Sequence, residues 1–337
     1  MRKFLLTACL ALTAAGILGL PSWARDDACL YRTVSLTAAD RELAPIPDLK
    51  PEDFRGEFRG KPVKIRSIVA DERPHRIVII LDASGSIGPP PPTTPGRSAW
   101  SLERQLASHL VEIRPRETTF ALLIFNDKVI DQIDFSQGPE AVVEKLRQIG
   151  ADSNYQKAHV KGRTALWDTV LVGLGLLHEP TSADAVYLIT DGGEDASRAT
   201  STDIRRRLAA SNSRVFVSLM VSSAGNRNRT PEELNGPEEM SKIAHATGGA
   251  IFGPVAQGSS GPVLLVTDSN QNLTISSGLR NFYKTMLGGY RIEIELPSPV
   301  DKWREWKLEL TKEKQKQFKD SQLGYTRDLE PCTELPK

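Results

Sequence analysis

From Arg76 onward, short and fully apolar runs alternate with longer stretches in which apolar residues recur at helical spacing. Ile77–Leu81, Phe120–Phe125 and Ala185–Ile189 are runs of this kind. A run without polar alternation predicts a strand that is buried on both faces, and amphipathic helices between such strands cover those faces. The sequence therefore predicts an α/β fold over residues 74–287, with a doubly wound, mostly parallel sheet and helices on both faces.

The segments on either side of this α/β part have β character. Residues 25–73 contain two strand-like pieces, Tyr31–Leu36 and Lys61–Val69, and predict an N-terminal β segment. Residues 288–337 predict a C-terminal β segment and tail, because YRIEIELP and WREWKLEL are typical of two antiparallel strands joined by a Pro-containing loop. The charged stretch TKEKQKQFKD is interpreted as a solvated edge or helix face.

The start of the chain has the layout of a targeting segment. A basic start (RK) is followed by an apolar segment, Phe4–Leu20, and by the small-x-small pattern SWA. This layout predicts a signal peptide over residues 1–24 that is cleaved after Ala24, and hence a secreted or periplasmic protein. Two alternatives stay open, because the apolar segment approaches the length of an uncleaved membrane anchor and Cys9 invites a lipoprotein interpretation.

The overall composition excludes several classes of partner. The chain of 337 residues has the charged and hydrophobic content of an ordinary globular protein, and its formal net charge is only +1. Nothing in that balance attracts nucleic acid or an anionic membrane surface.

Outside the predicted signal peptide there are two cysteines, Cys29 and Cys332. In an oxidising compartment they either form a disulfide or stay as two unpaired thiols in frayed tails.

Three oxygen-bearing side chains follow the first of the buried strands. Asp82, Ser84 and Ser86 form the pattern D-x-S-x-S directly after the apolar run. Carboxylate and hydroxyl oxygens are hard donors that suit Mg²⁺ or another hard divalent ion better than zinc. Because three ligands do not complete an octahedron, further oxygens have to come from elsewhere in the chain.

Two later positions offer such oxygens. Thr164 opens a helical stretch in GRTALWD, and Asp191 ends another apolar strand in YLITDGGED. In a sheet of this kind the crevice beyond the carboxyl ends of the strands is where ligands bind. Together with D-x-S-x-S, these two motifs resemble the von Willebrand factor A (VWA) family. The resemblance covers about Arg76–Phe252, and the flanks resemble those of secreted bacterial VWA-related proteins.

The resemblance implies a metal-ion-dependent adhesion site at these five positions. In the family, the serines and the threonine coordinate the ion directly, and the aspartates act largely through water. Neutral hydroxyl ligands leave the cation poorly neutralised, so that it attracts a carboxylate. The resemblance thus implies a non-enzymatic, adhesion-type module that binds Mg²⁺, with Ca²⁺ or Mn²⁺ as alternatives, and captures an acidic side chain of a partner protein. The ligands would be Asp82, Ser84, Ser86, Thr164 and Asp191.

Several neighbouring residues depart from the family pattern or add to it. Arg163 stands where the family often has a small residue, and its cation either repels the ion, helps to hold an acidic ligand or faces solvent. The insert Pro89–Pro95 separates D-x-S-x-S from the next helix and favours a stiff spacer or a rim beside the ion. Glu194 and Asp195 either bias the ion toward Ca²⁺ or cap the following segment.

The sequence lacks residues that other classes of protein require. A metal-dependent phosphohydrolase of the haloacid dehalogenase type needs an acid two residues after its nucleophilic aspartate, and this chain has Ser84 there. The G-x-S-x-G of serine hydrolases and the G-x-G-x-x-G of dinucleotide folds are missing from the expected places. The remaining alternative is a structural envelope protein in which the ion only stabilises the loops.

Overall fold

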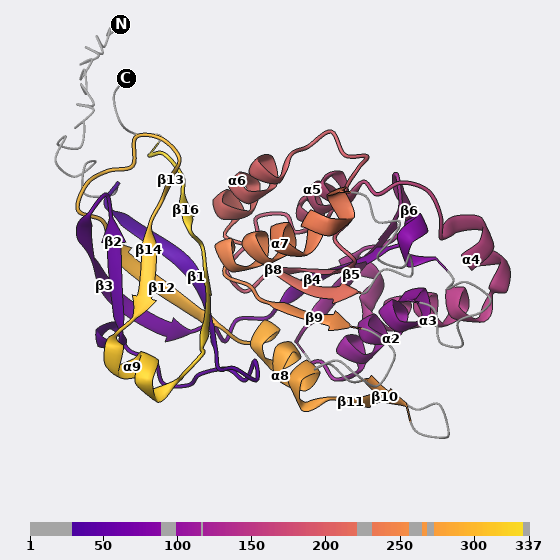
Figure 1. Cartoon of the computed structure of the whole chain (residues 1–337), viewed down its shortest axis with the longest axis horizontal. Helices are drawn as coiled ribbons and strands as arrows, with labels where there is room; N and C mark the ends of the chain where they lie inside the picture. The colour runs from indigo at the N-terminus through magenta and orange to yellow at the C-terminus, as the bar shows by residue number, and fades with distance from the viewer. Residues whose placement is uncertain are drawn as a thin grey trace, which may run out of the picture.

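Two six-stranded sheets dominate the fold, and they lie side by side (Figure 1). One carries helices on both faces, and the other is built from both ends of the chain. None of the helices in the described part of the chain combines the length and apolar character that crossing a bilayer requires. The predicted signal peptide and the insert Pro89–Pro95 lie outside the described residues. The computed structural model describes residues 29–88, 99–115, 117–220, 231–255, 265–267 and 273–332.

The α/β sheet is mostly parallel, as predicted. Its strand order is β6-β5-β4-β7-β8-β9, in which β6 runs antiparallel to its neighbour and the other pairs are parallel. The central strands are buried along nearly their whole length because their residues are apolar on both faces. The strands are β4 (Arg76–Asp82), β5 (Thr119–Phe125), β6 (Val129–Ile133), β7 (Ala185–Thr190), β8 (Arg214–Met220) and β9 (Ile251–Val255).

Helices cover both faces of this sheet, which confirms the doubly wound α/β prediction. Along β4, Ile77, Ile79 and Leu81 pack against the helices of one face, and Val78 and Ile80 pack against those of the other. The helices of the first face are α2 (Ala99–Glu112), α3 (Gly138–Ala151) and α8 (Ser277–Met286). Those of the second face are α5 (Leu166–Leu176), α6 (Ser201–Ser211) and α7 (Pro231–Ala246), while the short α4 (Ser153–His159) follows α3.

The second sheet is antiparallel and combines the two flanking segments. Its strand order is β14-β2-β3-β12-β1-β15, so strands from the two ends of the chain lie next to each other (Figure 1). Apolar side chains from all six strands form a separate core, which includes Val34, Phe58 and Ile292. The strands are β1 (Tyr31–Ala39), β2 (Phe54–Phe58), β3 (Lys61–Ala70), β12 (Tyr290–Glu295), β14 (Lys307–Leu310) and β15 (Gln322–Tyr325).

The pairing of the two C-terminal strands differs from the prediction. YRIEIELP forms β12, and WREWKLEL supplies β13 (Arg304–Glu305) and β14, but β2 and β3 lie between β12 and β14. β12 pairs with β1 on one side and with β3 on the other, and Ile292 and Ile294 are completely buried there. A hairpin with β14 would give β12 a short partner in place of the ten-residue β3, so the longer pairing prevails.

The remaining elements are short. The charged stretch TKEKQKQFKD contains α9 (Lys312–Gln317), which buries none of its side chains, so the solvated helix face is confirmed. β10 (Leu265–Thr267) pairs with β11 (Leu273–Ile275), and β13 pairs with β16 (Asp328–Leu329). Single 3₁₀ turns are η1 (Pro51–Asp53), η2 (Gly85–Ile87) and η3 (Phe135–Gln137).

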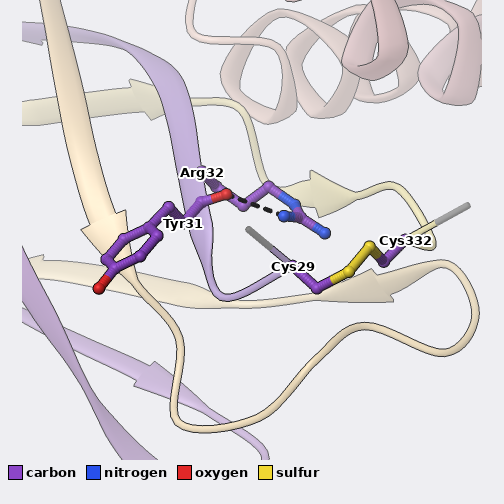
Figure 2. The surroundings of a disulfide bond; sticks show 4 residues. All are labelled: Cys29, Tyr31, Arg32 and Cys332. Atoms are coloured by element: carbon purple, nitrogen blue, oxygen red, sulfur yellow. Dashed lines mark hydrogen bonds between the residues drawn. A yellow bond between two sulfur atoms is a disulfide. The ribbon is translucent and has the colours of Figure 1, made fainter. Parts of the chain in front are cut away.

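A disulfide joins the two ends of the described chain. Cys29, just before β1, is bonded to Cys332, and their Cα atoms are 5.7 Å apart (Figure 2). Cys29 is buried, and the backbone N–H of Cys332 donates to the carbonyl oxygen of Val300 at 2.9 Å. Of the two alternatives that the sequence left open, the structure has the disulfide.

Buried charged groups hold the two chain segments that connect the sheets. Arg214, at the start of β8, is buried, and its guanidinium donates to the carbonyl oxygens of Met286, at 3.0 Å, and Gly288. Asp71, on the other connection, accepts a hydrogen bond from Arg73 Nε at 2.7 Å. Asp71 Oδ2 also accepts a hydrogen bond from Ser182 Oγ, just before β7, at 2.7 Å. Polar contacts to other segments therefore hold both connections.

Asp71 makes the stability of the protein depend on pH. Burial alone raises the pKa of its carboxyl, but hydrogen bonds from Arg73 and Ser182 outweigh burial and hold the pKa well below its usual range. A carboxyl with a depressed pKa in the folded state stabilises the protein at neutral pH, and this contribution is lost as the pH falls below about 4.

We therefore expect Asp71→Asn to lower the free energy of unfolding at neutral pH by about 1–2 kcal/mol. The deficit should shrink as the pH falls below about 4, since the Asp71 carboxyl of the unfolded wild-type chain then takes up a proton while that of the folded protein stays ionised. Urea denaturation at pH 7 and at pH 3 measures both values. Asp127→Asn, at an exposed carboxylate, is the matched control and should show no such pH-dependent deficit. A deficit of equal size at both pH values would contradict this role for Asp71.

Candidate metal centre

The two predicted aspartates emerge side by side at the carboxyl edge of the parallel sheet. Asp82 is the last residue of β4, and Asp191 comes directly after the last residue of β7. β4 and β7 are neighbouring parallel strands, with Leu81 opposite Ile189 in the register. Adjacent parallel strands end at the same edge of a sheet, so the strand pairing alone places both carboxylates at one site.

Asp82 orders the loop that carries the two serines. It is fully buried, its Oδ1 accepts a hydrogen bond from the N–H of Ser84 at 2.8 Å, and its Oδ2 accepts one from Thr190 Oγ1 at 2.6 Å. The loop then enters η2, and the Oγ atoms of Ser84 and Ser86 are 3.1 Å apart. The structure therefore brings Asp82 and both serines together on one short loop.

The loop that carries Thr164 is held against the serine loop by backbone hydrogen bonds. The N–H of Lys161 donates to the carbonyl oxygen of Ala83 at 2.9 Å, and the N–H of Gly85 donates to that of Gly162 at 3.0 Å. Thr164, which lies two residues further on, is buried. The segment before α5 is thus fixed beside D-x-S-x-S, although it lies about eighty residues away along the chain.

The same loop is also held against the segment that comes after Asp191. The N–H of Thr164 donates to Asp195 Oδ1 at 2.8 Å, and the carbonyl oxygen of Thr164 accepts from the N–H groups of Asp195 and Ala196, each at 3.1 Å. Three loops from distant parts of the sequence are therefore joined at one edge of the sheet. Each of the five predicted residues lies on one of these loops or at the strand end that leads into it.

The electrostatics of this edge fit a bound cation. Burial, together with repulsion from Asp191, raises the pKa of the Asp82 carboxyl above its usual value. Asp191 Oδ1 accepts from the N–H of Gly193 at 3.2 Å, whereas its buried Oδ2 has no hydrogen-bond partner among the described residues. A buried oxygen without a partner is costly, and a divalent cation would remove that cost.

The donor set is one of hard oxygens, which suits Mg²⁺, Ca²⁺ or Mn²⁺. Ser84, Ser86 and Thr164 would supply hydroxyls, and Asp191 would supply the carboxylate oxygen that lacks a partner. Within the residues that the structure describes, no three His, Cys, Asp or Glu side chains are grouped so that they could hold a metal ion by themselves. A cation at this edge would therefore depend on hydroxyl ligands.

The residues that accompany the motif have structural roles. Glu194 Oε1 accepts hydrogen bonds from the N–H groups of Ala196, at 3.0 Å, and Ser197, at 2.8 Å, so its carboxylate caps the following segment, as one of the two alternatives predicted. Its Oε2 also accepts from the N–H of Trp167, in the first turn of α5, at 3.0 Å. The carboxylate of Asp195 accepts hydrogen bonds from the N–H of Thr164 and, at 3.3 Å, from Nε of Arg163. The side chain of Arg163 is 65% exposed, so this ion pair is a weak surface contact.

The sequence analysis missed a third buried carboxylate near this edge, on α2. Glu103 is completely buried, and burial together with repulsion from Asp82 and Asp191 raises the pKa of its carboxyl well above its usual value. A signal for it was present in the sequence, because Glu103 shares helical spacing with Leu106, Ala107 and Leu110. A charged residue on the apolar face of a helix is unusual enough to single it out.

Comparison with known proteins agrees with this geometry. A family model for the von Willebrand factor type A domain matches residues 77–194. Domains of this family generally mediate protein–protein interactions and commonly bind a divalent metal. No curated protein sequence matches the chain.

Many solved structures are similar to the chain, including the following three. The conserved hypothetical protein BatB from Bacteroides thetaiotaomicron is 17% identical, with 54% of this chain and 91% of that chain covered and a TM-score of 0.38. An aerotolerance-related membrane protein from Bacteroides fragilis is 18% identical, with 54% and 92% covered and a TM-score of 0.39. A von Willebrand factor type A structure from Catenulispora acidiphila is 14% identical, with 90% and 75% covered and a TM-score of 0.41. From the family match over residues 77–194 and the doubly wound sheet, we conclude that the chain carries a domain of the von Willebrand factor type A family.

Proposed function

We propose that this protein is an exported, non-enzymatic binding module that holds a divalent cation, Mg²⁺ in the first place, and captures an acidic side chain of a partner protein. The observation that carries the proposal is the joining of three loops around Ser84, Thr164 and the unpartnered oxygen of Asp191. These loops bring the hydroxyls and the carboxylates to one edge of the sheet, where ligands of such folds bind.

The chemistry of the ligands explains why the partner should be acidic. When bound, the ion would supply a Lewis-acidic position that attracts a carboxylate oxygen. Ser84, Ser86 and Thr164 are neutral, so they orient the ion without cancelling its charge. Asp82 already uses both oxygens for Ser84 and Thr190, which favours an indirect role beneath the ion. A carboxylate from outside would then complete the shell.

Two features support the export of this protein. Residues 1–24 have the layout of a cleavable signal peptide, with cleavage proposed after Ala24. The Cys29–Cys332 disulfide is of the kind that persists in oxidising compartments, such as the periplasm or the extracellular space. A secreted or periplasmic location would also expose the carboxyl edge of the sheet to other envelope or extracellular proteins.

We expect Asp82→Ala and Thr164→Ala each to weaken Mg²⁺ binding by at least about tenfold, because one removes the group that orders the serine loop and the other removes a hydroxyl ligand. Calorimetric titration with Mg²⁺ measures the affinity, and far-ultraviolet circular dichroism verifies that the sheet stays folded. Thr164→Ser is the matched control, since it keeps the hydroxyl and should bind within about threefold of wild type. Unchanged affinity in both alanine variants would refute the site.

The structural alternative, in which the ion only stabilises the loops, predicts a different response to chelation. Under the binding proposal, proteins captured from an envelope extract are released by EDTA and are absent when Thr164→Ala is the bait. If chelation lowers the melting temperature but changes no captured protein, the ion has a stabilising role alone.

A further inference from the structure

Glu103 lies in the second turn of α2, with its carboxylate on the buried face of the helix. The residue is 0% exposed, and neither of its carboxylate oxygens has a hydrogen-bond partner among the described residues. Its neighbours on the same helix face are Leu106, Ala107 and Leu110, all of them completely buried. A carboxylate therefore occupies a position where the fold calls for an apolar side chain.

No nearby positive charge compensates for the burial of the Glu103 carboxylate. The next residue, Arg104, directs its guanidinium elsewhere, since Nη1 donates to the carbonyl oxygen of Leu146 at 3.4 Å and the group lies 5.9 Å from the Trp100 ring. No Arg, Lys or His among the residues that the structure covers forms an ion pair with Glu103. A buried carboxylate without a cation or donor is seldom retained for stability alone.

The charges that act on Glu103 are those of the metal centre. α2 packs on β4, the strand that ends at Asp82, and its buried residues share one core with Ala83 and Ile87 of the serine loop. From this helix the Glu103 carboxylate is repelled by those of Asp82 and Asp191. The three carboxylates are not grouped closely enough to hold one ion directly. A divalent cation at the serine loop would be attracted by all three, and Glu103 would act on it without coordinating it, through the electric field or through an ordered water.

We propose that Glu103 is a positioning residue of the metal centre, whose carboxylate tightens the hold on the cation and weakens the pull of the cation on an acidic guest. The inference rests on the proposed function. Asp82 and Asp191 lie close to the ion and offset part of its positive charge, and a third carboxylate nearby offsets more of it. Extra negative charge attracts the cation and opposes a further carboxylate, so the two affinities respond in opposite directions.

The test is Glu103→Gln, which keeps the shape of the side chain and removes its charge. Calorimetric titration should show Mg²⁺ binding about tenfold weaker than in wild type. Acetate, titrated into protein saturated with Mg²⁺, should bind about threefold more tightly, because less of the positive charge of the ion is then offset by the protein. Glu112→Gln, on the same helix but at a side chain that is 61% exposed, is the matched control and should change neither affinity.

The possible outcomes distinguish the role of Glu103 from the proposed binding of a divalent cation. Wild-type protein that binds no Mg²⁺ overturns the proposed function itself. Wild-type binding with an unchanged Glu103→Gln variant overturns only the role of Glu103. A folded variant that binds both Mg²⁺ and acetate more weakly also contradicts the proposal, because the two affinities would then change in the same direction. If the glutamine variant does not fold, Glu103→Leu replaces it, since leucine suits the apolar face of α2, and the same opposite changes are expected.

Discussion

Removing the Cys29–Cys332 disulfide is expected to lower the free energy of unfolding by about 4–5 kcal/mol. The two cysteines are separated by 303 positions, so the bond closes a loop that contains nearly all of the described chain. A cross-link of this span restricts the unfolded chain strongly, and its removal restores that conformational freedom. Urea denaturation of Cys29→Ser measures the loss.

The controls for this prediction are the other single variant and the double variant. Cys332→Ser, and Cys29→Ser combined with Cys332→Ser, should lose the same free energy as Cys29→Ser, because the bond is absent in all three. The free energy of unfolding of wild-type protein treated with a reductant should be close to that of the three variants. Losses that add up in the double variant would show that each cysteine acts through its own packing. Single variants as stable as wild type would show that the bond contributes little.

Trp306→Ala is expected to lower the free energy of unfolding by about 3–5 kcal/mol. The indole is 1% exposed in the core of the antiparallel sheet, and its Nε1 donates to the carbonyl oxygen of Thr326 at 2.8 Å. The ring packs edge-on against Tyr325, with the centroids 5.3 Å apart. It also lies close to Gly56 of β2, so one side chain joins strands from both ends of the chain. The loss leaves a large cavity and an unpaired buried oxygen.

Trp303→Ala is the matched control for this change, because it deletes the same ring only three residues earlier. Trp303 is half-buried, and its ring lies 6.0 Å from the guanidinium carbon of Arg206. Its removal should cost no more than about 1 kcal/mol. Thermal and urea denaturation should show a clearly larger loss of stability for Trp306→Ala than for Trp303→Ala. Equal losses would mean that the antiparallel sheet does not depend on Trp306 as its central packing residue.

The residues of the metal centre could be predicted from short sequence motifs, but the contacts between their loops could not. Asp82, Ser84 and Ser86 are two residues apart in turn, and their common loop follows directly from that spacing. Thr164 and Asp191 could be added because each has its own motif, LWD after the threonine and DGG around the aspartate. What local sequence could not supply is the backbone bonding of the three loops, since those hydrogen bonds join residues that are distant along the chain.

Glu103 escaped the sequence analysis for a different reason. No motif contains it, and its helix is separated from D-x-S-x-S by the stretch of prolines. The helical spacing marks it as core-facing, but spacing says nothing about which other charges lie nearby. Only the packing of α2 on the sheet places its carboxylate under the influence of Asp82 and Asp191.

The apolar runs were sufficient to predict the parallel sheet, because a strand buried on both faces must be apolar at successive positions, and that requirement is local. The antiparallel sheet is different. Its strands alternate in the ordinary way, and such alternation is compatible with many partners and registers. Contacts between the two ends of the chain selected β1 and β3 as the neighbours of β12 and brought Cys29 to Cys332. Pairing over such distances depends on the total apolar surface buried in the folded chain, which no short stretch of residues encodes.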